Sequence, residues 1–292
     1  NEQVLEKMSK DMQMRNFSHY TYYSYMHKGK EIIDYFNKPI EEVTTEELRD
    51  FLFNYLTEER KLADRSVNYY NSIIRFMYEV TLDKLINKKQ LPMRKRKKSV
   101  YKVLTKEELS TFFNCVDDYK FKTIFMIAYG SGLRIGEIVN LHISDIDSKK
   151  MRIFVREGKG NKERYSILSK TSLEMLRTYW SKYRKPVKSD KIFLTELDEP
   201  MTVGVIRDRF RRYRRKAGLN EKVTMHTLRH CYATNLIENG ATLIQVKELM
   251  GHSNIRSTME YVHVVNIDLG LESPLDVFMR GEEDGKNTRN NK

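Results

Sequence analysis

The chain has 292 residues, which is about the length of two ordinary domains, and 40% of them are hydrophobic, so it can fill real cores. Its formal net charge of +13 favours a polyanionic partner, of which nucleic acid is the commonest. The sequence argues against a membrane-spanning protein, because no segment is apolar over a sufficient length, and against a zinc finger or a disulfide scaffold, because the two cysteines form no CxxC pair.

The first ninety or so residues predict a small all-α domain of about four helices. A capping-box pattern at residues 44–47 opens a helix with apolar residues at helical spacing over 48–55. A second apolar stripe follows at residues 67–77, and an aromatic-rich stretch at 20–36 is also expected to be helical. We therefore expect an N-terminal helical domain over residues 1–93.

A basic linker is expected at residues 94–100. Pro92 and a run of five basic residues interrupt the apolar periodicity at this point. The run is a solvated tether, a localisation signal, or a segment that lies along DNA phosphates. The candidate DNA contacts here are Arg65 and Arg75 in the helical domain and Arg94, Lys95, Arg96, Lys97 and Lys98 in the linker.

The second domain is expected over residues 101–280, with helices around a short strand pair. Apolar periodicity and capping patterns predict helices at 105–113, 121–128, 134–141, 171–183, 203–216, 227–238 and 243–250. Candidate strands at 152–155 and 164–168 flank a glycine-bearing hairpin loop. The polar tail at 281–292 is expected to be disordered.

The helix at 203–216 carries a dense basic stretch. It is either a solvated helix face that docks through Phe210 and Tyr213, or a contact with the DNA backbone or major groove. Both interpretations can hold at once. The candidate DNA contacts on it are Arg207, Arg211 and Arg214.

Four separated motifs stand out in the second domain. They are GSGLRIGE at 130–137, GKG at 158–160, HTLRH at 226–230, and GHS at 251–253 with Tyr261 nine positions after His252. In this order and spacing they resemble the tyrosine recombinase (phage integrase) family, and its Xer-type and mobile-element integrases most of all. The resemblance covers nearly the whole chain.

The resemblance implies a fold and an assembly. The fold is mainly α with a small antiparallel β-sheet: a four-helix SAM-like core-binding domain and a catalytic domain, which together form a two-domain clamp on DNA. Four protomers then act on two double-stranded DNA sites. The apolar segment 269–278 after Tyr261 either docks on its own catalytic domain or packs into a neighbouring protomer.

The resemblance also implies the roles of the motif residues. Tyr261 is the nucleophile that forms a 3′-phosphotyrosine, and Arg134 and Arg229 offer planar forks of donors to the phosphate. Lys159 is the general acid for the leaving 5′ oxygen, with Lys162 as the competitor. His226 is either a proton acceptor for the tyrosine or a donor to the phosphate. His252 forms a hydrogen bond with the phosphate, and Glu137 orients the cluster. His142, His230 and His263 are expected to be structural.

The function implied is that of a site-specific recombinase or integrase that passes through a Holliday junction. No cofactor, ATP or metal is expected, because the ester stores the bond energy and basic side chains stand where a metal could. The expected setting is the bacterial cytoplasm, at the nucleoid. Two alternatives stay open: a type IB topoisomerase that relaxes supercoils, and a binding-only regulator of a mobile element.

Overall fold

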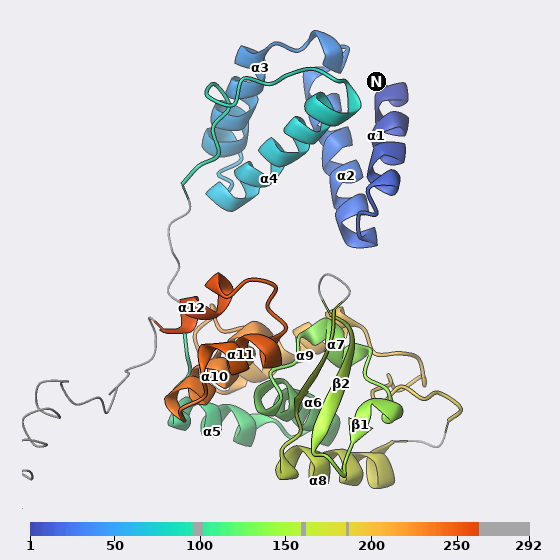
Figure 1. Cartoon of the computed structure of the whole chain (residues 1–292), viewed down its shortest axis with the longest axis vertical. Helices are drawn as coiled ribbons and strands as arrows, with labels where there is room; N and C mark the ends of the chain where they lie inside the picture. Colours follow the sequence, from blue (N-terminus) through green and yellow to red (C-terminus); the bar gives the residue numbers. More distant parts are fainter. Residues whose placement is uncertain (96–101, 159–161, 185–186, 263–292) are drawn as a thin grey trace, which may run out of the picture. The chain divides into compact units, whose positions relative to one another are not determined.

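The computed structural model describes residues 1–95, 102–158, 162–184 and 187–262, which fall into two compact units, Asn1–Ser99 and Val100–Lys292 (Figure 1). The described residues are mostly helical and contain one small antiparallel sheet, which confirms the expected fold class. The expected tail and the segment 269–278 lie outside the described residues. Of the helices that the structure describes, none is long and apolar enough to cross a membrane.

Apart from a short 3₁₀-helix at Ile40–Glu42, the described residues of the first unit form four helical segments. They are α1 (Glu2–Met14), α2 (His19–Phe36), α3 (Thr45–Asp50), which continues as π-helix to Glu59, and α4 (Asp64–Arg75), which continues as π-helix to Thr81. The predicted capping box is present: the Thr44 hydroxyl accepts from the Glu47 backbone N–H at 3.3 Å, and the Glu47 carboxylate accepts from the Thr44 N–H at 2.8 Å. Local hydrogen bonds of this kind fix where α3 begins.

The core of the first unit joins residues that are far apart in the sequence. Met8 and Met12 of α1 are fully buried, together with Ile32 of α2 and Ile73 and Ile74 of α4. Each helix buries one apolar stripe, as helical periodicity requires. The sequence pattern indicated about four helices in this unit but gave no range for α1.

The second unit packs helices around a three-stranded sheet. The strands are β1 (Ile146–Asp147), β2 (Arg152–Gly158) and β3 (Lys162–Ile167), in the order β1-β2-β3 and all antiparallel, with Phe154 opposite Tyr165. The sequence had indicated β2 and β3 but not β1. The helices are α5 (Lys106–Cys115), α6 (Tyr119–Gly130), α7 (Ile135–Val139), α8 (Lys170–Thr178, extended as π-helix to Tyr183), α9 (Val203–Lys216), α10 (Met225–Glu238), α11 (Leu243–Met250) and α12 (Arg256–Val262).

One predicted helix is shorter than expected. The sequence indicated a helix over 134–141, but α7 begins at Ile135 and ends at Val139. Arg134 caps this helix with an extended backbone (ψ 150°), and its N–H donates to the Glu137 carboxylate at 2.7 Å. Arg134 therefore occupies the N-cap position of α7 and lies outside the helix itself.

Two glycines allow the close packing that the second unit needs around its centre. Gly132 has a φ of +60°, and a Cβ there would lie 2.3 Å from the Tyr232 ring on α10. Gly251 ends α11 with a φ of +61°, and a Cβ there would lie 2.8 Å from Cδ of Arg164 on β3. A larger residue would be strained at either positive φ and would displace the side chain of Tyr232 or Arg164.

Candidate active site

A single buried carboxylate holds three arginines in the second unit. Glu137 of α7 accepts two hydrogen bonds from Arg164 of β3, both at 2.8 Å, and one from the Arg134 side chain, also at 2.8 Å. The guanidinium of Arg229 on α10 lies 3.8 Å from the same carboxylate. Three guanidiniums around one carboxylate leave a local charge of +2. This excess positive charge is suited to binding a doubly charged anion or a phosphate group.

The electrostatics of Glu137 follow from this crowding. Its side chain is only 6% exposed. Burial by itself raises the pKa of the carboxyl, but the hydrogen bonds and charge of Arg164, followed by those of Arg134, outweigh it and lower the pKa to about 2. Glu137 is therefore ionised at any physiological pH and can orient the arginines.

The arginines differ in how far they reach the surface. Arg229 is buried and donates to the carbonyls of Gly132 and Met250. Burial, and then the charge of Arg134, lower the pKa of its guanidinium to about 9, so it stays cationic at neutral pH. Arg134 is 21% exposed and donates to the Gly251 carbonyl at 3.4 Å, so its guanidinium can still meet an anion from solvent.

Two histidines flank this cationic cluster. His226 lies one turn before His230 at the start of α10 and is exposed. Partial desolvation, and then the charges of Arg229 and Arg134, lower its pKa. His252 follows Gly251 at the end of α11, and its Nδ1 lies 2.9 Å from the Thr258 hydroxyl. Burial, and then the charge of Arg229, lower the pKa of His252 to about 4, so this imidazole is neutral near pH 7.

Tyr261 lies on α12 against both α10 and the end of α11. It is only 3% exposed, and its ring is nearly parallel to that of His252, with centroids 6.1 Å apart and an interplanar angle of 15°. Its hydroxyl oxygen lies 3.1 Å from Nδ1 of His230. The structure thus places the one tyrosine that the motif spacing singled out beside the histidine–arginine cluster.

Most of the sequence-predicted site residues meet at this point. Arg134 and Arg229 both lie against Glu137, Arg134 also donates to the carbonyl of Gly251 next to His252, and the ring of His252 lies beside that of Tyr261. Lys159 lies outside the described residues, in the sequence between Gly158, where β2 ends, and Lys162, where β3 begins. For the described residues, no group of three or more His, Cys, Asp or Glu side chains is arranged to hold a metal ion.

Sequence reasoning missed two members of the cluster. Arg164 is two residues from the buried Ser166 on β3 and shares its face, so strand periodicity was the signal that could have placed it inside, where a charge needs a partner. His230 lies four positions after His226 on the same face of α10. It was expected to be structural, but it contacts the hydroxyl of Tyr261.

The basic residues predicted to contact DNA fall into two groups. Those with exposed side chains are Arg65, Lys95, Arg207 and Arg211, the last of which also pairs with Asp208 at 3.1 Å. The others donate to the chain itself: Arg75 to the Leu91 carbonyl, Arg94 to Asp64 at 3.0 Å, and Arg214 to the Glu221 and Val223 carbonyls. Arg96, Lys97 and Lys98 lie outside the described residues.

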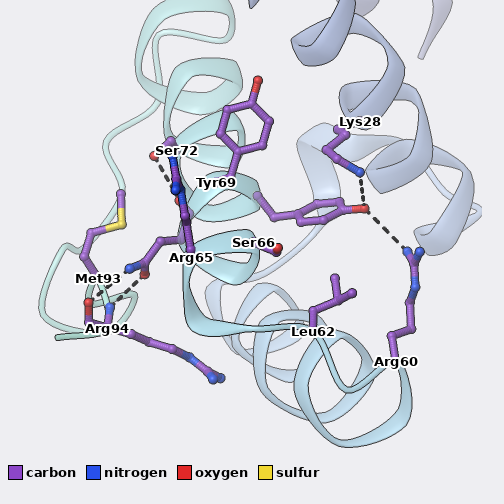
Figure 2. Close-up of a pocket in the computed structure, with 11 residues that line it drawn as sticks. Lys28, Arg60, Leu62, Arg65, Ser66, Tyr69, Ser72, Met93 and Arg94 are labelled. Carbon is purple, nitrogen blue, oxygen red and sulfur yellow. Dashed lines mark hydrogen bonds between the residues drawn. The ribbon is translucent and has the colours of Figure 1, made fainter. Parts of the chain in front are cut away.

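A basic concavity of about 570 Å³ marks the first unit (Figure 2). Arg65 and Arg94 line one side of it, and Lys28 and Arg60 line the other. Lys28 donates to the Tyr70 hydroxyl at 2.7 Å, and that hydroxyl donates to Glu31 at 2.6 Å. Lys28 and Arg60 also pair with Glu31, and Arg94 pairs with Asp64, so the four cations keep an excess charge of +2 that an anionic backbone can approach.

Comparison with known proteins covers both units. The phage integrase family model matches residues 102–266, and the model of the phage integrase N-terminal SAM-like domain matches residues 4–88. A putative integrase/recombinase of Sinorhizobium fredii, y4qK, is 34% identical over 94% of this chain and 89% of that protein. The tyrosine recombinase XerA of Pyrococcus horikoshii is 32% identical over 90% of each chain.

Solved structures show the same architecture. The crystal structure of XerA recombinase is 25% identical, covers 97% of this chain and 98% of its own, and gives a TM-score of 0.52. The Tn1549 transposon integrase, solved with transposon right end DNA, gives a TM-score of 0.72 at 19% identity over 96% of this chain and 98% of that one. At that level of identity the likeness concerns the fold.

Proposed function

Since the chain belongs to the phage integrase family and is a tyrosine recombinase, we propose that it cuts and rejoins double-stranded DNA at specific sites through a 3′-phosphotyrosine. The observation that carries the mechanism is the position of Tyr261 beside a cluster with an excess charge of +2. A nucleophile next to fixed cations is what phosphoryl transfer needs, because charge accumulates on the phosphate oxygens in the transition state.

In the proposed reaction the Tyr261 oxygen attacks a DNA phosphorus, and the bond from phosphorus to the 5′ oxygen breaks. Arg134 and Arg229 hold the non-bridging oxygens, with Glu137 fixing the planes of both guanidiniums. His226 and His252 add hydrogen bonds to the phosphate. Lys159, or Lys162 in its place, gives a proton to the departing 5′ oxygen.

The assembly and the setting belong to the same proposal. Two units, one with the basic concavity and one with the cluster, close on DNA as a clamp. Four protomers act on two sites, exchange strands in pairs through a Holliday junction, and need no ATP or metal because the phosphotyrosine keeps the bond energy. Recombination takes place on nucleoid DNA in the bacterial cytoplasm. Its role is either the movement of a mobile element or the resolution of chromosome dimers.

A trapping experiment tests this function. Duplexes of random sequence with a nick near the centre let a short 5′-hydroxyl fragment diffuse away after cleavage, so the protein stays attached to the DNA 3′ end. Sequencing the trapped ends gives the site, and plasmids with two copies of it are then assayed for recombination and for relaxation. We expect a defined site and recombinant products. Relaxation of the plasmid without site preference would indicate a type IB topoisomerase. Specific binding without covalent adducts would indicate a binding-only regulator.

Binding is expected to depend steeply on salt, because Lys and Arg residues displace condensed counterions from DNA. The double variant Lys95→Gln and Lys97→Gln tests whether the linker lies on phosphates. If both lysines contact phosphates, the slope of log affinity against log salt falls by about 0.9 for each contact. The control pair, Lys7→Gln and Lys10→Gln on α1, removes the same charge from exposed positions. Equal slopes for both pairs would make the linker a plain tether.

A further inference from the structure

The hydroxyl of Tyr261 points at a histidine that the family motif does not assign to it. Nδ1 of His230 lies 3.1 Å from the Tyr261 oxygen, and the two rings have their centroids 5.5 Å apart. That is hydrogen-bond distance between a phenol and an imidazole nitrogen. With the proton of His230 on Nε2, the Tyr261 O–H donates to the lone pair of Nδ1.

His226 and His230 lie four residues apart on one face of α10, with ring centroids at 6.3 Å, but in different surroundings. The charges that act on His226 are those of Arg229, Arg134 and Arg207, which lower its pKa, and of Glu137, which raises it; Arg229 and Arg134 are the groups proposed to hold the phosphate. His230 is less exposed and contacts the nucleophile itself. On the same face of α10, His226 therefore lies towards the arginines proposed to hold the phosphate, which we call the phosphate side. His230 lies towards the nucleophile, Tyr261.

The groups that face His230 determine its protonation. They are His226 and Arg229 on α10, His252 after α11, and Tyr261 on α12. Burial, and then the electrostatic effects of His226 and Arg229, lower the pKa of His230 to about 4, so its imidazole is neutral at physiological pH but only weakly basic. A DNA phosphate bound beside these cations brings negative charge, which raises the basicity of the imidazole.

We propose that His230 is the proton acceptor for Tyr261, distinct from the phosphate-side His226; this rests on the proposed function. The Tyr261 O–H bond breaks as the oxygen–phosphorus bond forms, and the proton moves to Nδ1 of His230. The bond from phosphorus to the 5′ oxygen breaks at the same phosphorus, and that oxygen takes its proton from the lysine acid. In rejoining, the neutral lysine amine takes back the proton of the attacking 5′ hydroxyl, and the imidazolium returns its proton to the departing Tyr261 oxygen.

A substrate with sulfur in place of the 5′ bridging oxygen separates the base from the acid. A thiolate leaves without protonation, so this substrate should restore most of the rate that Lys159→Ala loses. It should not restore His230→Ala, because the nucleophile still has to lose its proton. Single-turnover cleavage of the nicked trap duplex is measured with the wild type, both variants and His226→Ala. We expect His230→Ala to be slower by about 10²- to 10⁴-fold on both substrates.

Added imidazole distinguishes a base from a purely structural residue, because it can raise the cleavage rate of a variant only where a proton acceptor is missing. It should enter the space left in His230→Ala and recover part of the rate, with more basic imidazoles recovering more, while leaving His226→Ala unchanged. His27→Ala, at an exposed histidine of the first unit, is the matched control and should behave as the wild type. Gel shifts on a specific site should show that His230→Ala binds as the wild type does.

Several results would overturn the proposal. They are cleavage by His230→Ala at or above the wild-type rate, restoration of that variant by the sulfur substrate, or imidazole rescue of His226→Ala instead. If circular dichroism shows His230→Ala unfolded, His230→Asn decides: the amide keeps a hydrogen bond to Tyr261 but has no basic nitrogen, so a wild-type rate there contradicts the proposal. Absence of adducts with the wild-type protein would instead refute the proposed function itself.

Discussion

Replacing Tyr261 with Phe is expected to abolish covalent DNA–protein adducts while site binding survives. The change removes one hydroxyl and little volume from a ring that is 3% exposed and packed against His252, so the fold should persist. Without the oxygen no phosphotyrosine can form. Denaturing gels of the nicked trap duplex measure the adduct, and gel shifts measure binding.

The matched control for this variant is Tyr129→Phe. Tyr129 lies in the same unit, and its hydroxyl accepts from the Asn235 amide at 2.8 Å, so the variant also loses one tyrosine hydroxyl and one hydrogen bond. We expect it to form adducts at the wild-type level. Adducts that persist in Tyr261→Phe would assign the nucleophile to a different tyrosine.

The second large effect is expected on stability. Glu137→Gln leaves three arginines around a neutral amide, and breaking a buried ion pair in this way costs about 3–5 kcal/mol. Urea unfolding followed by circular dichroism measures the loss of free energy of unfolding. Glu6→Gln, at an exposed carboxylate of α1, should change it by less than about 0.5 kcal/mol. A similar small change for Glu137→Gln would show that the carboxylate does not hold the cluster.

The same carboxylate predicts an acid dependence with a definite sign. The pKa of Glu137 is about 2 in the folded chain, against an ordinary value of 4.5 for a glutamate. A lowered pKa contributes stability that is fully present above about pH 4.5 and is lost as the pH falls towards 2, by about 3 kcal/mol. The slope of stability against pH in that window should be shallower in Glu137→Gln than in the wild type. Equal slopes would contradict the assigned pKa.

The sequence by itself determined those features that depend on neighbouring residues. The capping boxes at Thr44 and Thr105 form as expected, and α9 and α11 have the predicted bounds, because helix starts and stops depend on hydrogen bonds within a few residues. The pairing of β2 with β3 followed in the same way from a short glycine-bearing loop between two β-prone runs. The order and spacing of the four motifs indicated the family, which the comparisons confirmed.

Only the tertiary structure decided which side chains meet. Arg164 and Glu137 are 27 residues apart, and His230 and Tyr261 are 31 apart, so no local pattern could pair them. The same holds for Arg75 and Arg214, whose donors are taken by carbonyls that packing brings near. The physical reason is that a buried charge or nucleophile acquires its partners from the elements that fold over it, and those contacts depend on how helices and strands pack rather than on the residues beside it in the chain.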